Sequence, residues 1–226
     1  MALYELMSWM SPAFPVGAFS HSGGLEWVVE AGLVTDRIST EAWLEDSLSI
    51  GAAWNDCVAF VYAHRAAIAA DFESFLEIAD LALASLTSFE RRLESTAQGE
   101  AFLRIAKVSA ACDALEVLKP IRQGELAYPI AVACVAAGHK ISLTDALIAY
   151  LHGTISNQIS AAQRLVPLGQ TDAQLAIAAL RETVQSTAAE AASLQGDPVN
   201  HLRGGAFMAD IACMAHETQY TRLFRT

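Results

Sequence analysis

The chain has 226 residues, of which 54% are apolar and only 17% charged, and this length suits a single domain with a large core. Its 25 acidic residues outnumber the 14 basic ones, and the formal net charge of −11 argues against binding to nucleic acid or to anionic lipid. The longest apolar run, 129–138, is far shorter than the roughly 20 residues that span a bilayer, and the first ten residues lack a basic leader, so we expect a cytoplasmic protein.

The apolar excess has two interpretations. A monomer with a large, alanine-rich core would account for it. Alternatively, partner proteins or a second copy of the chain cover part of the surface, because large exposed apolar patches are a liability in a lone protein. We favour the second interpretation and expect a homodimer.

Helical spacing runs through almost the whole chain. Alanine and leucine recur every three or four residues, and alternating runs of β-branched residues are missing. The sequence therefore predicts an all-α, single-domain fold, with a helical bundle over 1–196 followed by a linker and docking segment over 197–226. The shorter predicted helices are 24–31, 40–53, 55–69, 72–86 and 128–137.

Residues 11–24 interrupt this pattern near the start of the chain. They are rich in proline, glycine and serine, which form tight turns and are poor choices for an amphipathic helix. A serine in such a loop, as at Ser20 or Ser22, more often caps a helix than attacks a carbonyl, and no GxSxG motif surrounds either one. We interpret His21 as part of the turn, with a soft metal ligand or a pH-sensitive contact as the alternative.

The clearest predicted helix lies over 86–115. Its apolar residues follow one stripe from Leu86 through Phe89 and Ile105 to Leu115, which is typical of an amphipathic helix, and Pro120 ends it. The opposite face carries charged side chains: Glu90, Arg91, Glu94, Glu100, Arg104 and Lys107.

Two further helices are predicted from their capping residues. Ser142 and Asp145 have the spacing of a capping box, and the apolar periodicity that follows continues until Pro167 stops it. Thr171 and Gln174 offer a second capping box, for a helix that runs towards position 192.

Glycine and proline at 196–198 and at 204–205 bracket a predicted linker before the last twenty residues. We expect those residues to hang off the bundle as a docking segment, because they hold types that are enriched in interface cores rather than in disordered tails. The alternative is a terminal helix folded back on its own core. The residues concerned are Phe207, Met208, Ile211 and Met214 at helical spacing, then Tyr220, Arg222, Leu223, Phe224 and Arg225.

Motifs for catalysis or cofactor binding are missing from the sequence. There is no GxxxxGK[ST] loop and no GxGxxG after a strand, so neither a P-loop GTPase nor a dinucleotide site is supported. The six histidines are solitary, and His216 with Glu217 fails the HExxH zinc pattern at its second histidine. The four cysteines form no CxxC pair, which fits reduced thiols. We therefore predict no catalytic, cofactor-binding or metal-ligating residue.

Three segments, in order along the chain, resemble one family. Residues 11–34 (SPAFPVGAFSHSGGLEWVVEAGLV) resemble the opening signature of the UreF urease accessory proteins, as do residues 150–170 with the continuation SAAQRLVPLGQTDAQ. Residues 208–226 (MADIACMAHETQYTRLFRT) are similar to the C-terminus of that family, and 90–105 and 127–132 fall where it has similar segments. The chain departs from the family at two positions. It has His21 where the family usually has an aromatic residue, and Gly23 where the family often has a larger polar residue.

The resemblance implies an accessory scaffold rather than an enzyme. Such a protein pairs with itself and with UreD, also called UreH, recruits the GTPase UreG, and engages apo-urease. The complex then inserts nickel into urease in a step coupled to GTP hydrolysis, so nickel and GTP are handled by the complex, and no cofactor is expected to bind this chain tightly.

The resemblance also implies three contact regions. The surface for UreD or UreH would include His216, Glu217, Tyr220, Arg222, Leu223, Phe224 and Arg225. Dimer formation or UreG binding would use Tyr150, Arg164, Pro167, Gly169 and Gln170, although Pro167 and Gly169 equally suit a simple turn between helices. A partner-facing loop would contain Pro12, Pro15, Gly17, Ser20, Ser22 and Glu26.

Two other functions stay open at this point. The chain could regulate the GTPase activity of UreG directly, for example by supplying Arg222 or Arg225 to the transition state. It could instead be an unrelated helical protein that binds a ligand within its bundle.

Overall fold

The computed structural model describes residues 2–121 and 125–226, and it confirms the all-α prediction, since these residues form helices and loops without a strand. Short 3-10 helices lie at η1 (Ala18–Ser20), η2 (Asp113–Leu118) and η3 (Pro198–His201). The α-helices are α1 (Ala2–Trp9), α2 (Leu25–Glu30), α3 (Arg37–Ile50), α4 (Ala52–Ala69), α5 (Phe72–Ala84), α6 (Phe89–Ser109), α7 (Tyr128–Gly138), α8 (Leu143–Leu165), α9 (Gln170–Ala179), α10 (Arg181–Ser193) and α11 (Phe207–His216).

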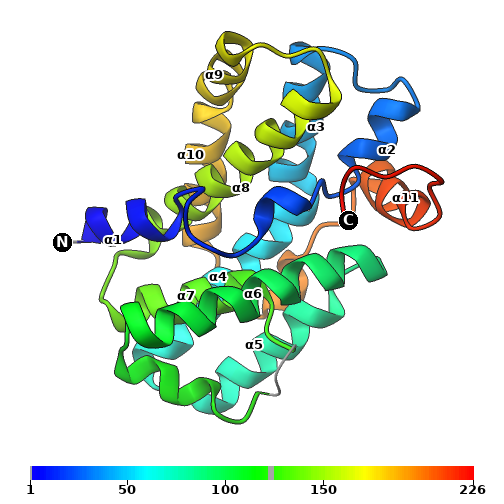
Figure 1. Ribbon diagram of the computed structural model, residues 1–226. Helices are drawn as coiled ribbons and strands as arrows, with labels where there is room; N and C mark the ends of the chain where they lie inside the picture. The colour runs from blue at the N-terminus through cyan, green and yellow to red at the C-terminus, as the bar shows by residue number, and fades with distance from the viewer. Residues whose placement is uncertain (1, 122–124) are drawn as a thin grey trace.

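The core is centred on α7, which packs against α4 and α6 (Figure 1). Each residue from Pro129 to Ala137 is buried, as expected for a helix that is apolar on all sides. On one side of this centre lie α5 and α6, and on the other lie α3, α8, α9 and α10, while α1 and the α2–α11 pair occupy opposite ends of the molecule (Figure 1). No helix within residues 2–121 and 125–226 has both the length and the apolarity that a membrane crossing requires.

Of the two helix starts predicted from capping residues, the one at Ser142 is confirmed. The Ser142 hydroxyl accepts a hydrogen bond from the backbone N–H of Asp145, and α8 ends at Leu165, two residues before Pro167. The predicted cap at Thr171 is wrong by two residues, because Gly169 is the N-cap of α9, its N–H donates to the carboxylate of Asp172, and the helix begins at Gln170. The predicted single helix towards 192 is also interrupted at Leu180, where α9 ends and α10 begins.

The orientation of α6 contradicts the prediction from its apolar stripe. Phe89 and Val108 of that stripe are 68% and 83% exposed, whereas Glu90 and Glu94 on the charged face are buried. Gly99 explains why this face turns inward: a Cβ at that position would lie 2.1 Å from the carbonyl oxygen of Leu126, so only glycine lets the start of α7 approach. The charged side chains of this face then need partners from other helices.

The C-terminal part of the chain is held on the bundle. The Trp54 indole donates to the carbonyl of His201, Asn55 bonds the backbone of Arg203, and the Arg203 guanidinium lies 3.5 Å from the centre of the Trp54 ring. Beyond this linker, α11 packs against α2 and α6. The expectation that the last twenty residues hang off the bundle is therefore wrong, and the alternative of a terminal helix folded back on the core describes the structure.

Candidate functional site

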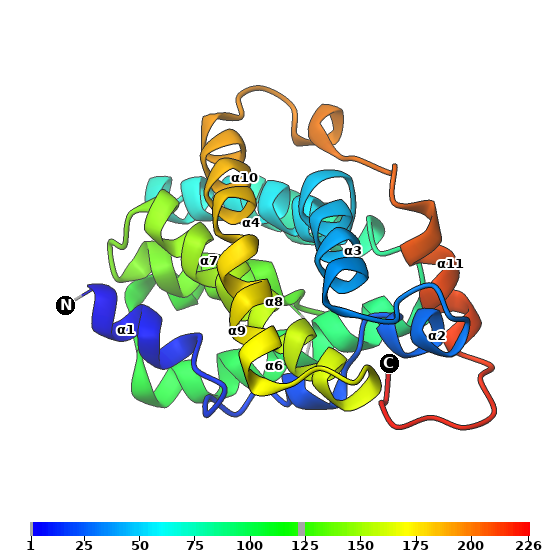
Figure 2. The same cartoon turned by 90° about the horizontal axis from the view of Figure 1, so that it is seen from above.

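The predicted partner residues at both ends of the chain meet at one junction. Figure 2 shows α2, α11 and the C-terminus side by side, and α6 runs beneath them. Close approach of α2 and α11 depends on Gly24, which has a φ of 84° and whose Cβ, if present, would lie 2.9 Å from the backbone nitrogen of Cys213. We call this region, formed by residues 20–26, Glu90 and residues 207–226, the C-terminal junction.

Glu26 of α2 fixes the segment that follows α11. One of its carboxylate oxygens accepts the backbone N–H of Leu223 at 2.6 Å, and the other accepts that of Phe224 at 2.9 Å. The same carboxylate lies 3.0 Å from Nε2 of His216, and Glu26 is buried. Glu26 is thus occupied by the chain's own tail.

His216 lies at the centre of the junction and has no exposed surface. Its Nδ1 lies 2.7 Å from a carboxylate oxygen of Glu90, and the other oxygen of Glu90 accepts a hydrogen bond from Arg222 at 3.1 Å. Burial raises the pKa of Glu90, and the hydrogen bond and charge of His216 oppose that shift. His216 and Glu26, both predicted as contact residues, therefore hold the tail from inside.

Phe224 anchors the end of the tail in a small apolar cluster. Its side chain is 3% exposed, and the Arg164 guanidinium lies 4.1 Å from the centre of its ring. Arg164 also donates to the carbonyl of Phe19 at 2.7 Å. The other buried members of the cluster are Leu25, Val28, Val34, Ala161, Ala162, Val166 and Ala212.

The loop at 11–24 binds the last residues of the chain. Ser22 donates its N–H and its hydroxyl to the carbonyl oxygen of Thr226, at 2.6 and 3.0 Å, and the N–H of Arg225 donates to Ser20 at 2.8 Å. His21 Nδ1 lies 2.7 Å from the Thr226 hydroxyl, and burial lowers the pKa of His21. Ser22 is fully buried here, so within the predicted partner-facing loop the exposed positions are Pro12 and Pro15, with Gly17 and Ser20 partly exposed.

An exposed apolar surface covers the outer side of the junction. Tyr220 is fully exposed and Leu223 is 61% exposed, and Glu217, Arg222 and Arg225 also reach solvent. The outward face of α11 adds large apolar side chains, and Phe89 at the start of α6 lies beside them because its N–H donates to Glu217. We call this the α11 face; it comprises Phe89, Phe207, Met208, Ile211 and Met214, of which the last four belong to the predicted docking segment and Phe89 was not predicted for any site.

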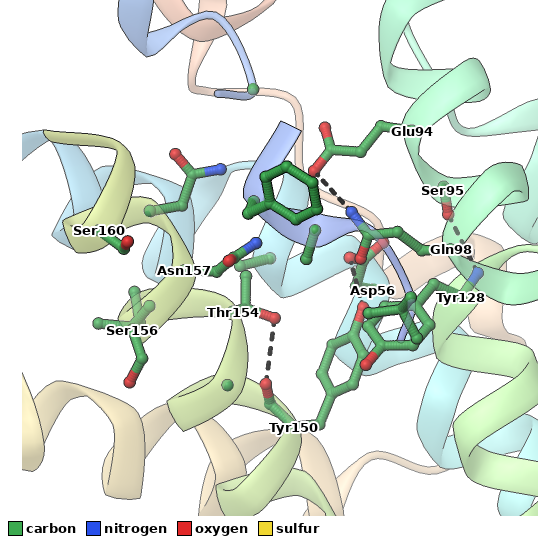
Figure 3. Close-up of a pocket in the computed structure, with 18 of the residues that line it drawn as sticks. Asp56, Glu94, Ser95, Gln98, Tyr128, Tyr150, Thr154, Ser156, Asn157 and Ser160 are labelled. Atoms are coloured by element: carbon green, nitrogen blue, oxygen red, sulfur yellow. Dashed lines mark hydrogen bonds between the residues drawn. The ribbon is translucent and has the colours of Figure 1, made fainter. Parts of the chain in front are cut away.

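A second feature is a cavity of about 290 Å³ between the 9–19 loop, α6 and α8 (Figure 3). Its polar wall joins α4, α6 and α8: the Tyr150 hydroxyl donates to Asp56 at 2.9 Å, and Arg91 pairs with Glu94 at 2.8 Å. Burial raises the pKa of Asp56 and of Tyr150. Burial lowers the pKa of Arg91, but the charges of Glu94 and Asp56 outweigh it and the net shift is upward.

The residues predicted for dimer formation or UreG binding separate into two places. Tyr150 is 2% exposed and lies at the cavity wall. Arg164, Pro167, Gly169 and Gln170 are exposed at the turn between α8 and α9. The predicted set therefore does not form one surface, and only the turn is available to a partner. Among residues 2–121 and 125–226, no three or more His, Cys, Asp or Glu side chains are grouped so that they could hold a metal ion.

Comparison with known proteins gives a consistent result along the chain. Residues 34–181 match the model of the UreF family. Two proteins named urease accessory protein UreF, from Rhodopseudomonas palustris strains BisB18 and HaA2, are each 49% identical to the chain. The alignments cover all of this chain and 92% and 94% of those relatives. A protein of the same name from Bradyrhizobium diazoefficiens is 47% identical, over all of this chain and 92% of its own length.

Proposed function

The chain belongs to the UreF family of urease accessory proteins, and from this premise we propose that it is a non-catalytic scaffold which joins UreD or UreH to the GTPase UreG. In this role it brings both proteins to apo-urease in the cytoplasm, where nickel is inserted with GTP hydrolysis. Nickel is then cargo of the complex, and GTP is the substrate of UreG.

The α11 face is the observation that carries this proposal. Five large apolar side chains, each between 47% and 71% exposed, form this face: four lie on α11, and Phe89 lies at the start of α6. Exposed apolar patches of this kind mark protein interfaces, and aromatic residues and methionine are enriched in interface cores. The fixed tail beside it adds Tyr220, Leu223 and Arg225 to the same surface.

We assign this surface to UreD or UreH. Glu217, Tyr220, Arg222, Leu223 and Arg225 would meet the partner directly, while His216 and Phe224 hold the segment in place from the inside. The exposed turn at 164–170 is the proposed surface for the second copy or for UreG.

The test is co-purification of the full-length chain with UreD or UreH and with UreG. Ile211→Asp places a charge in the middle of the α11 face, and we expect at least a tenfold loss of UreD or UreH binding, as for a central interface residue. Val108→Asp is the matched control, because Val108 is 83% exposed near the other end of α6. Equal recovery of partners by both variants would rule out this surface.

A point substitution is sharper here than removal of the tail. A chain ending at Gly205 would also expose the pockets of Phe224 and His216, so its failure to bind would have two explanations. Ile211→Asp leaves those buried contacts in place.

A rival proposal is that the chain accelerates GTP hydrolysis by inserting an arginine into the active site of UreG. Arg225 is the better candidate, since it is exposed, whereas Arg222 is paired with Glu90. The scaffold proposal expects Arg225→Ala to leave the single-turnover GTP hydrolysis rate of the preassembled complex unchanged. A loss of about a thousandfold or more would favour the arginine finger.

The cavity beside Tyr150 supports a different rival, a ligand-binding bundle. Metal analysis and mass spectrometry of the purified chain under native conditions test it. A stoichiometric metal or organic ligand would count against a pure scaffold.

A further inference from the structure

We propose that His216, held between Glu26 and Glu90, is a proton-operated latch: its imidazolium form keeps residues 217–226 docked, and loss of the proton favours their release. This inference concerns the chain's own tail, so it stands independently of which partner the tail meets.

The hydrogen-bond geometry around the ring suits the imidazolium form. Both ring nitrogens lie at hydrogen-bond distance from carboxylate oxygens, 2.7 Å at Nδ1 and 3.0 Å at Nε2, and the ring has no exposed surface. A neutral imidazole has one N–H and one lone pair, so it would turn a lone pair towards one of the two carboxylates. The imidazolium donates to both.

The charges that face the latch also require this proton. Glu26 comes from α2, Glu90 from α6 and Arg222 from the tail, and the side chains of the two carboxylates are only 8% and 4% exposed. With His216 charged, two negative groups meet two positive groups. Without the proton, a buried negative charge lacks its partner, which is costly. At the edges of the site, Arg164 of α8 acts on Glu26, and Glu217 acts on Glu90.

The proton is coupled to the tail because the same carboxylates bind it. Glu26 accepts the N–H groups of Leu223 and Phe224, and Glu90 accepts Arg222. A neutral His216 ring turns a nitrogen lone pair towards Glu26 or Glu90, and the repulsion would push that carboxylate away. Because each of these carboxylates also binds the tail, its movement would weaken docking. The remaining anchors would be Phe224 in its pocket and the backbone bonds of Arg225 and Thr226 to the 20–22 segment.

The sign of the pH dependence follows from counting protons. A histidine side chain in water loses its proton near pH 6.5, and the proposed latch keeps this proton in the docked form. Above that pH, docking takes up one proton, so it is favoured by acid and weakens as the pH rises, by up to tenfold per pH unit. Below pH 6.5 both forms carry the proton, and docking no longer depends on this group.

Nuclear magnetic resonance of the ¹⁵N-labelled full-length chain, from pH 6 to 9, tests the latch. Ring-nitrogen shifts distinguish imidazolium from the neutral tautomers, and His216→Gln identifies the His216 signals. Exposed His152 is the internal reference. We expect His216 to stay doubly protonated after His152 has become neutral. Hydrogen-exchange protection of the Leu223 and Phe224 amides, corrected for intrinsic rates, should fall over the same pH range.

Two substitutions separate the latch from a merely structural contact. In Glu90→Gln the side-chain amide donates to a neutral ring, so protection of the tail amides should become nearly independent of pH. Glu182→Gln removes an exposed carboxylate on α10, outside the junction, and should keep the pH dependence of the wild type. If Glu90→Gln fails to fold, His216→Gln serves instead, because its side chain does not titrate.

A neutral His216 ring throughout the range would overturn the proposal, and so would tail protection that does not change with pH in the wild-type chain. These measurements use the isolated protein. If Ile211→Asp loses partner binding but tail protection in the wild type does not change with pH, the scaffold proposal holds and the latch is ruled out. If Ile211→Asp binds its partners normally but tail protection changes with pH as expected, the latch holds and the proposed interface is ruled out.

Discussion

The centre of the bundle and the C-terminal junction each bury a histidine, but they do so in opposite ways. His64 on α4 is 2% exposed and has the carbonyl of Ile141 as its hydrogen-bond partner, at 3.0 Å, among apolar side chains. Its pKa is lowered, chiefly by burial. His216 is equally buried but faces two carboxylates. The buried histidine of the centre is thus surrounded by apolar side chains, whereas the buried histidine of the junction lies between two carboxylates.

From this difference we expect that destabilising the centre unfolds the whole domain, whereas destabilising the junction unfolds the junction alone. The central helices share one large core in which α7 packs against both α4 and α6, so we expect damage there to spread. The junction has a smaller cluster of its own, built on α2, α8 and α11 with Phe224. A region with few apolar contacts unfolds locally at lower free energy than the core.

The largest effect is expected from Phe60→Ala on α4. Phe60 is fully buried against Tyr150 and His64, and its removal should lower the free energy of unfolding by about 3 to 5 kcal/mol. Urea denaturation followed by circular dichroism measures this. Phe72→Ala, at a position 55% exposed at the start of α5, is the matched control and should change stability by less than about 1 kcal/mol. Similar losses in both variants would contradict the assignment of the core.

A smaller and local effect is expected from Phe224→Ala. Loss of this anchor should raise the opening equilibrium of the tail by about a hundredfold, or about 3 kcal/mol, because the ring is buried in the small cluster. The urea midpoint of the bundle should change little. Hydrogen exchange of the Leu223 and Arg225 amides reports the opening, and Leu223→Ala, at an exposed side chain, is the control. Global destabilisation by Phe224→Ala, as large as that by Phe60→Ala, would show that the two regions unfold as one.

The centre of the bundle was largely predictable from sequence, and the junction was not. Helical periodicity and the Ser142 cap gave the helices, since these signals are local. The inward face of α6 was missed because Glu90 and Arg91 look like a solvent-exposed face until their partners are known. Those partners lie up to 132 positions away in sequence, as with Arg222 and Glu90. The position of Gly99 on the same face was the available signal, because a glycine within a long helix indicates close approach of another chain segment.

The structure shows where the predicted site residues lie, and their role in binding partners stays a prediction. The tail residues do gather at one place, but the sequence could not divide them into buried anchors and exposed contacts, because helical spacing stops at His216 and the rest is irregular. Glu26 was predicted as part of a partner-facing loop, without any residue of the chain as its own partner. Its hydrogen bonds go to backbone N–H groups, which every residue except proline has, so the sequence does not reveal them. The α11 face was visible as apolar residues at helical spacing, yet its exposure depends on which side of α11 packs on α2.

The two buried histidines should respond to acid in opposite ways. A base whose pKa is lowered on folding contributes stability that is fully present above its ordinary pKa of about 6.5 and is lost as the pH falls below it. The difference in unfolding free energy between the wild type and His64→Gln, which keeps an N–H donor for Ile141, should therefore move in favour of the variant on acidification. The proposed latch predicts the opposite response for the junction, namely that docking of the tail strengthens on acidification. Urea denaturation between pH 5 and 8 measures the first response. If the difference in unfolding free energy between the wild type and His64→Gln does not change with pH, His64 has the same proton affinity in the folded and the unfolded chain. Burial would then not lower the pKa of His64, and this prediction would be wrong.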